Sequence, residues 1–192
     1  MSDTQRGLSM VEVIIFIVLV GVAIAGVLGV MNTVVSRSSD PMVRKQAMAI
    51  AEAMLEEVQL MPMTYCDPDD ANVLSAANGA GCASAANNET TSAPQAGETR
   101  YSPATPFDNV ADYNGFDTST AVPSGIRDIG GTAMAGLDGY RAVVSVAPAA
   151  LAGAGYTVAA TNALLVTVSV TGPTGESVRL QAYRTRHAPR NP

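Results

Sequence analysis

The chain has no tryptophan, a single histidine and few charged residues, and these scarcities limit the chemistry that it can perform. Nucleophilic catalysis of the Ser-His-Asp or Cys-His kind needs a histidine that packing holds in place, whereas His187 lies near the C-terminus. A metal site commonly uses more than one histidine or cysteine, and the sequence contains no phosphate-binding glycine loop. We therefore expect no catalytic residue, no metal site and no cofactor, and we expect that the protein is not an enzyme.

Charged residues make up only 15% of the 192 residues, and the formal net charge is −6 at pH 7. Free nucleic acid is a poor partner for a chain of that sign. Four arginines nevertheless gather near the C-terminus, where they could form a local basic patch or simply a solvated strand face and tail: Arg179, Arg184, Arg186 and Arg190. The length allows one modest domain and an anchor, and the Ala-, Val- and Gly-rich composition suits a thin domain that contains a sheet.

Residues 13–31 read VIIFIVLVGVAIAGVLGVM and contain no charge over 19 residues. As a helix they span roughly 28 Å, close to the hydrocarbon thickness of a bilayer. The run is longer than the core of a secretory signal peptide, and no small-x-small cleavage site follows it. We expect a retained, single-pass anchor. Positive charge follows this segment at Arg37, Arg44 and Lys45, which by itself favours a cytoplasmic C-terminal part.

Glu12 is a carboxylate at the start of this apolar run, between Val11 and Val13. Burying it costs on the order of 2.5–3.5 kcal/mol at the bilayer centre and less near the edge. Such a residue usually has a partner, and the simpler alternative is that Glu12 reaches the lipid headgroups.

Residues 6–12 read RGLSMVE, in which a short polar leader ends at Gly7 and Glu12 is the fifth residue after it. This pattern resembles the processing site of type IV prepilins and of type II secretion pseudopilins. The resemblance implies that a prepilin peptidase removes residues 1–7 as a leader and N-methylates the new terminal residue, Leu8. It also implies that Glu12 forms an assembly salt bridge with the Leu8 amine of a neighbouring subunit.

The sequence departs mildly from the commonest prepilin pattern. Leu8 replaces the usual Phe, and Ser9-Met10 replaces Thr-Leu. The apolar segment has no proline and contains three glycines instead: Gly21, Gly26 and Gly29.

Four further stretches look similar to minor pilins of the MSHA pilus and to minor pseudopilins: DPMVRKQAMAIAEAMLEEV (40–58), CDPDD (66–70), FDNVADYNGF (107–116) and RTRHAP (184–189). The resemblance implies an α+β, type IV pilin-like fold, with a long N-terminal helix packed on a small antiparallel sheet. It implies an inner-membrane anchor with the C-terminal domain in the periplasm, and incorporation into a surface pilus. The implied partners are other pilins or pseudopilins and the prepilin peptidase/methyltransferase.

Whether the two cysteines form a disulfide depends on the compartment in which the domain lies. In an exported domain, Cys66 and Cys82 are expected to form one disulfide, whereas in the cytosol they would be two unrelated thiols. The periplasmic location that the resemblance implies favours the disulfide.

The sequence predicts a helix from about residue 9 to 60, divided into a membrane half (8–35) and an amphipathic half (36–61). Ser39-Asp40-Pro41 is typical of a helix start, so we expect a bend or interruption near residues 36–41. Apolar residues then recur at three- and four-residue steps on one face: Val43, Ala47, Ile50, Ala51, Met54, Val58 and Met61. Pro62 ends the pattern.

Residues 62–138 are expected to be rich in loops, and residues 139–187 to form an antiparallel sheet before a short tail, 188–192. Three segments of the sheet region have strand character: 140–147, 163–171 and 177–184. Gly172-Pro173-Thr174-Gly175 predicts a hairpin between the last two. One face of the sheet is expected to pack on the amphipathic half of the helix.

Two acidic groups could bind calcium through carboxylate oxygens. One is Asp67, Asp69 and Asp70, and the other is Asp108, Asp112 and Asp117 with Asn109 and Asn114. Aspartates in turns more often accept hydrogen bonds from backbone amides, so calcium is the alternative to our expectation of no cofactor.

Three hypotheses for function remain. The first is a structural minor pilin of an MSHA-type IV pilus, and the second is a minor pseudopilin of a type II secretion system. The third, of another class, is a bitopic, membrane-anchored periplasmic binding or sensor domain, in which Gly7 is not cleaved and Glu12 is dispensable.

Overall fold

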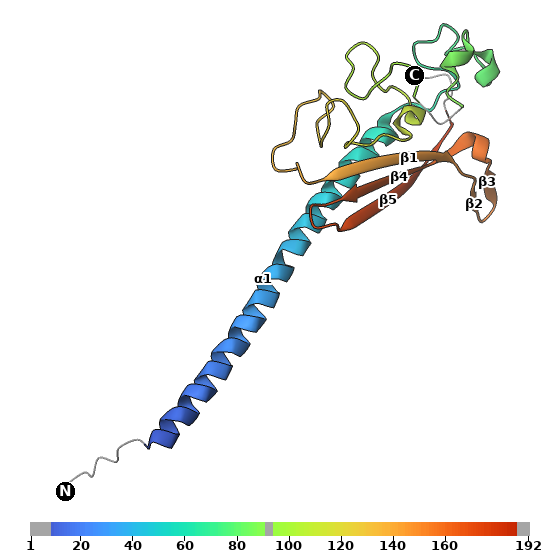
Figure 1. Cartoon of the computed structure of the whole chain (residues 1–192). Coiled ribbons are helices and arrows are strands. Elements are labelled where there is room, and N and C mark those ends of the chain that lie inside the picture. The colour runs from blue at the N-terminus through green and yellow to red at the C-terminus, as the bar shows by residue number, and fades with distance from the viewer. Residues whose placement is uncertain (1–8, 91–93, 188–192) are drawn as a thin grey trace. The chain divides into compact units, whose positions relative to one another are not determined.

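The computed structural model describes residues 9–90 and 94–187, without the side chains of residues 34–40. The chain divides into two compact units, Met1–Met42 and Val43–Pro192. Its secondary structure is one long helix followed by loops and a small antiparallel sheet (Figure 1), which is the expected α+β layout.

Helix α1 runs without interruption from Met10 to Leu60, a length of 51 residues. The predicted helix start at Ser39-Asp40-Pro41 is wrong, because Pro41 lies inside the helix. Continuing past a proline costs roughly 3 kcal/mol, but stopping there would require a second, unfavourable helix nucleation. Helical patterns on both sides of Pro41 therefore prevail over the local start signal.

The first half of α1 is apolar around its whole circumference. Among the described residues, one segment, Met10–Thr33, is long and apolar enough to cross a membrane, with a mean hydropathy of 3.1. Taken by itself, this segment presents Phe16, Leu19 and Leu28 outward, as well as Ile and Val side chains in other directions. A helix that is hydrophobic all round is typical of a membrane span or of a fully buried helix.

The second unit contains two antiparallel sheets. The larger one has the order β1-β4-β5, formed by Arg141–Pro148, Ala163–Thr171 and Ser177–Thr185. These strands confirm the three predicted segments within one residue at each end. The smaller sheet, β2 (Leu151–Gly153) with β3 (Tyr156–Val158), was not predicted.

The β4–β5 hairpin has the predicted turn. The Gly172 N–H donates to the Glu176 carbonyl oxygen over 2.9 Å, and Gly175 has a φ of +83°, which favours glycine. A side chain at Gly172 would also collide with α1, since its Cβ would lie 2.6 Å from Val43 Cγ1. Gly172 therefore lets the turn approach the helix, and Gly175 adopts the backbone conformation that the turn requires.

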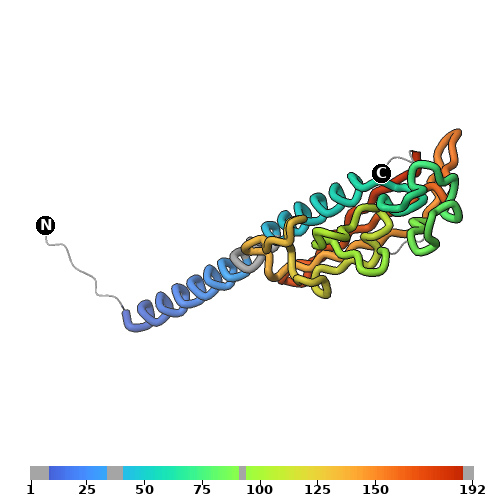
Figure 2. The backbone as a smooth tube through the Cα atoms, turned by 90° about the horizontal axis from the view of Figure 1, so that it is seen from above, coloured from blue at the N-terminus to red at the C-terminus, as the bar shows by residue number. Residues whose placement is uncertain are grey.

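The core lies between the second half of α1 and the larger sheet, as expected. Alternate residues are buried from Ala142 to Val146 of β1 and from Leu164 to Val170 of β4, and α1 contributes most of the apolar face predicted from its periodicity. The buried residues include Ala47, Ile50, Ala51, Met54 and Val58 of α1 with Val144, Val146, Val166, Val168 and Val170 of the sheet. Residues of the loop region, among them Met63 and Tyr113, complete this core. Figure 2 shows the backbone of the loop region beside the second half of α1.

The region from 62 to 138 is loop-rich, as predicted, with short 3-10 helices at Gly79–Gly81, Ala85–Asn87 and Val110–Tyr113. A disulfide joins Cys66 to Cys82, with a Cα–Cα distance of 5.5 Å. A fourth 3-10 helix, Ala160–Asn162, precedes β4.

Candidate functional site

Glu12 lies in the first turn of α1 and is exposed within its unit. A carboxylate there interacts favourably with the helix dipole, at about 0.3–1 kcal/mol. Its expected partner, the Leu8 amine, and the expected cleavage position, Gly7, lie outside the described residues, as do the leader 1–7 and the tail 188–192. The pairing and the processing therefore remain predictions.

Two of the four C-terminal arginines, Arg184 and Arg186, form contacts inside the domain, whereas Arg179 is exposed and Arg190 lies outside the described residues. Arg184 donates to the Met61 carbonyl oxygen over 3.0 Å, and Arg186 donates to the carbonyl oxygens of Met63 and Thr64. The Arg186 guanidinium also lies 4.5 Å from the centre of the Tyr65 ring. These contacts tie the end of β5 to the chain that leaves α1, so they favour a structural role over a basic binding patch.

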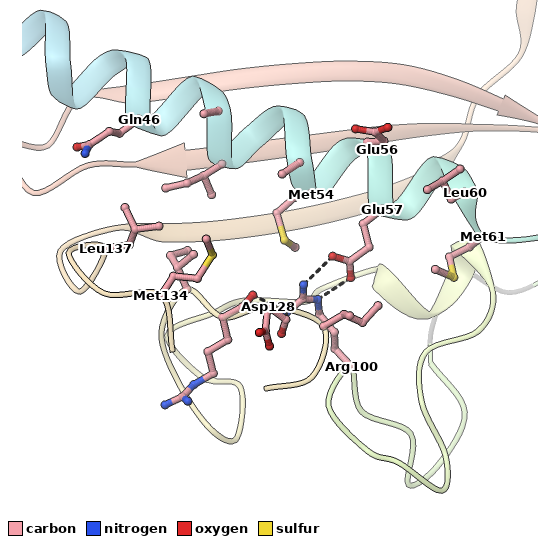
Figure 3. A pocket seen from close by; sticks show the side chains of 16 residues that line it. Gln46, Met54, Glu56, Glu57, Leu60, Met61, Arg100, Asp128, Met134 and Leu137 are labelled. Carbon is pink, nitrogen blue, oxygen red and sulfur yellow. Dashed lines mark hydrogen bonds and ion pairs between the residues drawn. The ribbon is translucent and has the colours of Figure 1, made fainter. Parts of the chain in front are cut away.

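A buried ion pair joins α1 to the loop region. Arg100 donates from Nε and Nη2 to the two carboxylate oxygens of Glu57, both over 2.6 Å, and Tyr113 Oη donates to Glu57 Oε1 over 2.8 Å. Burial disfavours the charged guanidinium, but the Glu57 carboxylate prevails and raises the pKa of Arg100. The pair lies in a groove of about 580 Å³ beside α1 (Figure 3). The groove is otherwise largely apolar, and Met54, Met134 and Leu137 line it.

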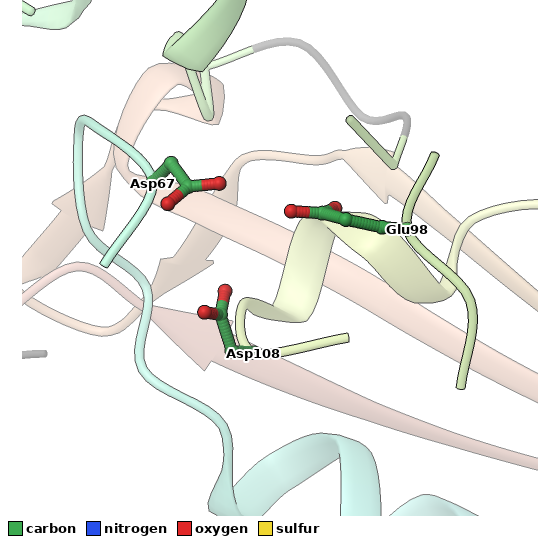
Figure 4. A group of neighbouring side chains, drawn as sticks. All are labelled: Asp67, Glu98 and Asp108. Carbon is green, nitrogen blue, oxygen red and sulfur yellow. The ribbon is translucent and has the colours of Figure 1, made fainter. Parts of the chain in front are cut away.

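Three carboxylates from distant parts of the loop region meet in space. One oxygen each of Asp67, Glu98 and Asp108 lies within 4.8 Å of the others (Figure 4). Asp112 and Glu89 are close enough for their charges to act on members of this group. We call Asp67, Glu89, Glu98, Asp108 and Asp112 the acidic cluster.

Backbone pairing explains how these positions come together. Residues 65–67 pair with residues 87–89, since the Asp67 N–H donates to the Asn87 carbonyl oxygen over 2.9 Å and the Glu89 N–H to that of Tyr65 over 3.0 Å. The 107–113 segment is joined to the same place, because Asn109 Nδ2 donates to Thr64 Oγ1 over 2.8 Å. The disulfide lies beside this pairing, because Cys66 directly precedes Asp67 in the sequence.

Burial and mutual repulsion change the acidity of the cluster. Desolvation, assisted by the neighbouring carboxylates, raises the pKa of Glu89, Glu98 and Asp112. The same causes raise the pKa of Asp108 to about 7. In the described part of the chain, the only ion pairs are Glu57–Arg100 and Asp117–Arg141, so no member of the cluster has a cation in direct contact.

The structure separates the acidic residues that the sequence grouped. Of the first group, only Asp67 belongs to the cluster. Asp69 is exposed, and the Asp70 carboxylate accepts backbone N–H bonds from Asn72, Ala83 and Ser84.

Of the second group, Asp108 and Asp112 belong to the cluster, whereas Asp117 pairs with Arg141, which lowers its pKa. Asn109 accepts from the Ala111 N–H over 3.2 Å as the cap of the Val110–Tyr113 helix, and Asn114 Oδ1 accepts from the Val146 N–H over 2.9 Å. Sequence reasoning missed Glu89 and Glu98 because their approach to Asp67 depends on pairing between segments.

The disulfide allows a direct test of compartment. If the domain is exported, both thiols should resist alkylation in the natively extracted, unreduced protein, and two should react after reduction and unfolding, as counted by mass. Replacing both Cys66 and Cys82 by serine should lower stability by roughly 3 kcal/mol, because a loop of this length loses its closure. Two freely alkylated thiols before reduction would instead support the cytoplasmic topology that the flanking positive charges favour.

Comparisons with protein-family models, with curated proteins and with solved structures gave no match to this chain.

Proposed function

We propose that the chain is a structural minor pilin of an MSHA-type IV pilus, held in the bacterial inner membrane by α1 and assembled through that helix. The observation that carries the proposal is the sequence RGLSMVE directly before an uncharged helical segment, with Glu12 in the first turn of the helix. An apolar helix can exchange lipid for the core of a filament at little hydrophobic cost, whereas its buried carboxylate then requires a cation. The terminal amine of a neighbouring subunit would supply that cation and set the axial register.

The second unit supports the same proposal. The latter half of α1 buries one face on a three-stranded antiparallel sheet, which is the arrangement that a pilin-like fold requires. Such a domain, with its C-terminal part in the periplasm, would be carried by the helix into a filament. In this role the partners are other pilins and the prepilin peptidase/methyltransferase, and the chain performs no catalysis itself.

Two alternatives share part of this support. A minor pseudopilin of a type II secretion system would have the same processing site and the same helix. A bitopic binding or sensor domain would need only the anchor, and it would leave Gly7 uncleaved and Glu12 without a partner.

The mass of the membrane-extracted protein tests the proposal. In a strain with active prepilin peptidase, the mature chain should lack residues 1–7 and carry one additional methyl group on Leu8. The same chain from a peptidase-deficient strain should keep the leader and serves as the control. Retention of residues 1–7 in the active strain would refute processing and would leave the plain membrane anchor.

A further inference from the structure

The acidic cluster contains buried oxygen atoms that the protein itself does not satisfy. Asp112 is only 1% exposed and Glu89 only 3%. Asp112 Oδ1, Glu89 Oε2 and Asp108 Oδ1 are buried and have no hydrogen-bond partner. An unpartnered buried carboxylate oxygen is costly, and a bound cation would offset this cost.

The remaining oxygens are held in place by donors of the protein. Asp112 Oδ2 accepts the backbone N–H bonds of Asp108 and Asn109, over 3.1 and 2.7 Å. Gln95 donates to Glu89 Oε1 from its side chain and to Glu98 Oε2 from its backbone, over 2.6 and 2.9 Å. Asp67 Oδ1 likewise accepts from the Asp69 N–H over 2.6 Å. These contacts orient the carboxylates while leaving the unpartnered oxygens available.

The unpartnered oxygens belong to carboxylates of the same cluster. The charge of Asp112 acts on Glu89, Glu98 and Asp108, and Asp108 is one of the three carboxylates drawn in Figure 4. The Arg186 guanidinium interacts with Glu89 at longer range, while it donates to the carbonyl oxygens of Met63 and Thr64. It therefore leaves most of the negative charge uncompensated.

We propose that the acidic cluster binds one calcium ion through Asp67, Glu98 and Asp108, with Asp112 and Glu89 completing the anionic shell. Calcium takes 6–8 oxygen ligands at about 2.3–2.6 Å, and two oxygens on opposite sides of one ion then lie about 5 Å apart. One oxygen each of Asp67, Glu98 and Asp108 lies within 4.8 Å of the others, so the three oxygens are close enough to bind one such ion. Magnesium usually keeps several waters and uses only one or two carboxylates, and zinc prefers His and Cys, whereas both cysteines are in the disulfide.

Bound calcium would join three segments of the loop region. Asp67 follows the end of α1, and Glu98 lies between the 3-10 helices Ala85–Asn87 and Val110–Tyr113. Asp108 and Asp112 lie at the start of the Val110–Tyr113 helix. The ion would neutralise the repulsion among them and act beside the disulfide at Cys66. The expected consequence is a domain whose loops are ordered more firmly when calcium is present.

The test uses the full chain in non-ionic detergent, freed of metal with EDTA and dialysed. Equilibrium dialysis with radioactive calcium should give one ion per chain. A 100-fold excess of calcium over the dissociation constant should raise Tm by roughly 5–10 °C, whereas magnesium at the same concentration should have little effect.

Variants separate binding from a general charge effect. Asp108→Asn and Glu98→Gln should each weaken calcium binding at least tenfold and abolish most of the Tm rise. Their Tm in EDTA should equal or exceed that of the wild type, because one repulsive charge is gone, and this shows that they fold. Asp138→Asn removes the same charge from an exposed position before β1 and should behave as the wild type.

Three results would overturn the proposal. The first is no bound calcium at 5 mM, and the second is wild-type binding by Asp108→Asn. The third is an equal Tm rise with magnesium or with sodium chloride of equal ionic strength, which would show charge screening alone.

Discussion

Arg100→Met should lower the free energy of unfolding by about 3–5 kcal/mol, because it removes one partner of a buried ion pair and leaves the other unpaired. The side chain of Arg100 is 3% exposed and that of Glu57 is 16% exposed. Their two parallel hydrogen bonds form the bidentate geometry that makes such pairs strong. After the substitution, Glu57 retains only the Tyr113 hydroxyl as a donor among these contacts.

A double-mutant cycle identifies the cause of this loss. Glu57→Gln with Arg100→Met should be less destabilising than the sum of the two single changes, because neither charge is then left alone. Urea denaturation of the detergent-solubilised chain, followed by the near-ultraviolet circular dichroism of its tyrosines, measures all three variants.

The matched comparison is the second ion pair. Arg141→Met removes the exposed partner of that pair, since the Arg141 side chain is 56% exposed, and Asp117 keeps the Ser119 N–H and Oγ as donors, so the loss should be no more than about 1 kcal/mol. Equal losses for Arg100→Met and Arg141→Met would contradict the special weight that burial gives to the Glu57 pair.

The elements that sequence reasoning located have strong local patterns. Apolar and polar residues alternate with period two in the 163–171 and 177–184 segments, and Gly172 to Gly175 is a turn sequence. The strands, the hairpin and the buried face could therefore all be predicted. The apolar positions of the second half of α1 repeat at helical steps, and five of the seven predicted positions are buried in the structure, while Val43 and Met61 are partly buried. In these places local preference and tertiary packing agree.

Local patterns were insufficient elsewhere. Leu151–Gly153 and Tyr156–Val158 are three-residue strands in an Ala- and Gly-rich stretch, too short to show a period. Ser39-Asp40-Pro41 has a genuine start signal, but the helical preference of both flanks prevails. The acidic cluster depends on contacts between distant segments, such as the pairing of residues 65–67 with 87–89 that brings Glu89 near Asp67, and no local pattern indicates such pairing.

Two roles would explain a carboxylate at Glu12, and they differ in the free energy that its removal should cost. As a first-turn carboxylate it gains about 0.3–1 kcal/mol from the helix dipole. In that case Glu12→Ala would be nearly neutral, or slightly favourable for membrane insertion, because a desolvation cost disappears. As the partner of a neighbouring subunit's Leu8 amine, it would instead be essential only after the subunit enters a filament.

Glu12→Ala should therefore insert and be cleaved normally, since the cut precedes Leu8, but its incorporation into pili should fall more than a hundredfold. The reason is that a buried amine in the filament loses its counter-charge, at a cost of about 3–5 kcal/mol. Glu12→Gln, which keeps hydrogen bonding without charge, should be intermediate. Glu52→Ala removes an exposed carboxylate from the same helix and is the control.

The assay compares the fraction of processed protein in sheared pili, or crosslinked to other pilins, with that of the wild type. Co-assembly of Glu12→Ala at the wild-type level would rule out the register-setting pair and favour the plain membrane anchor.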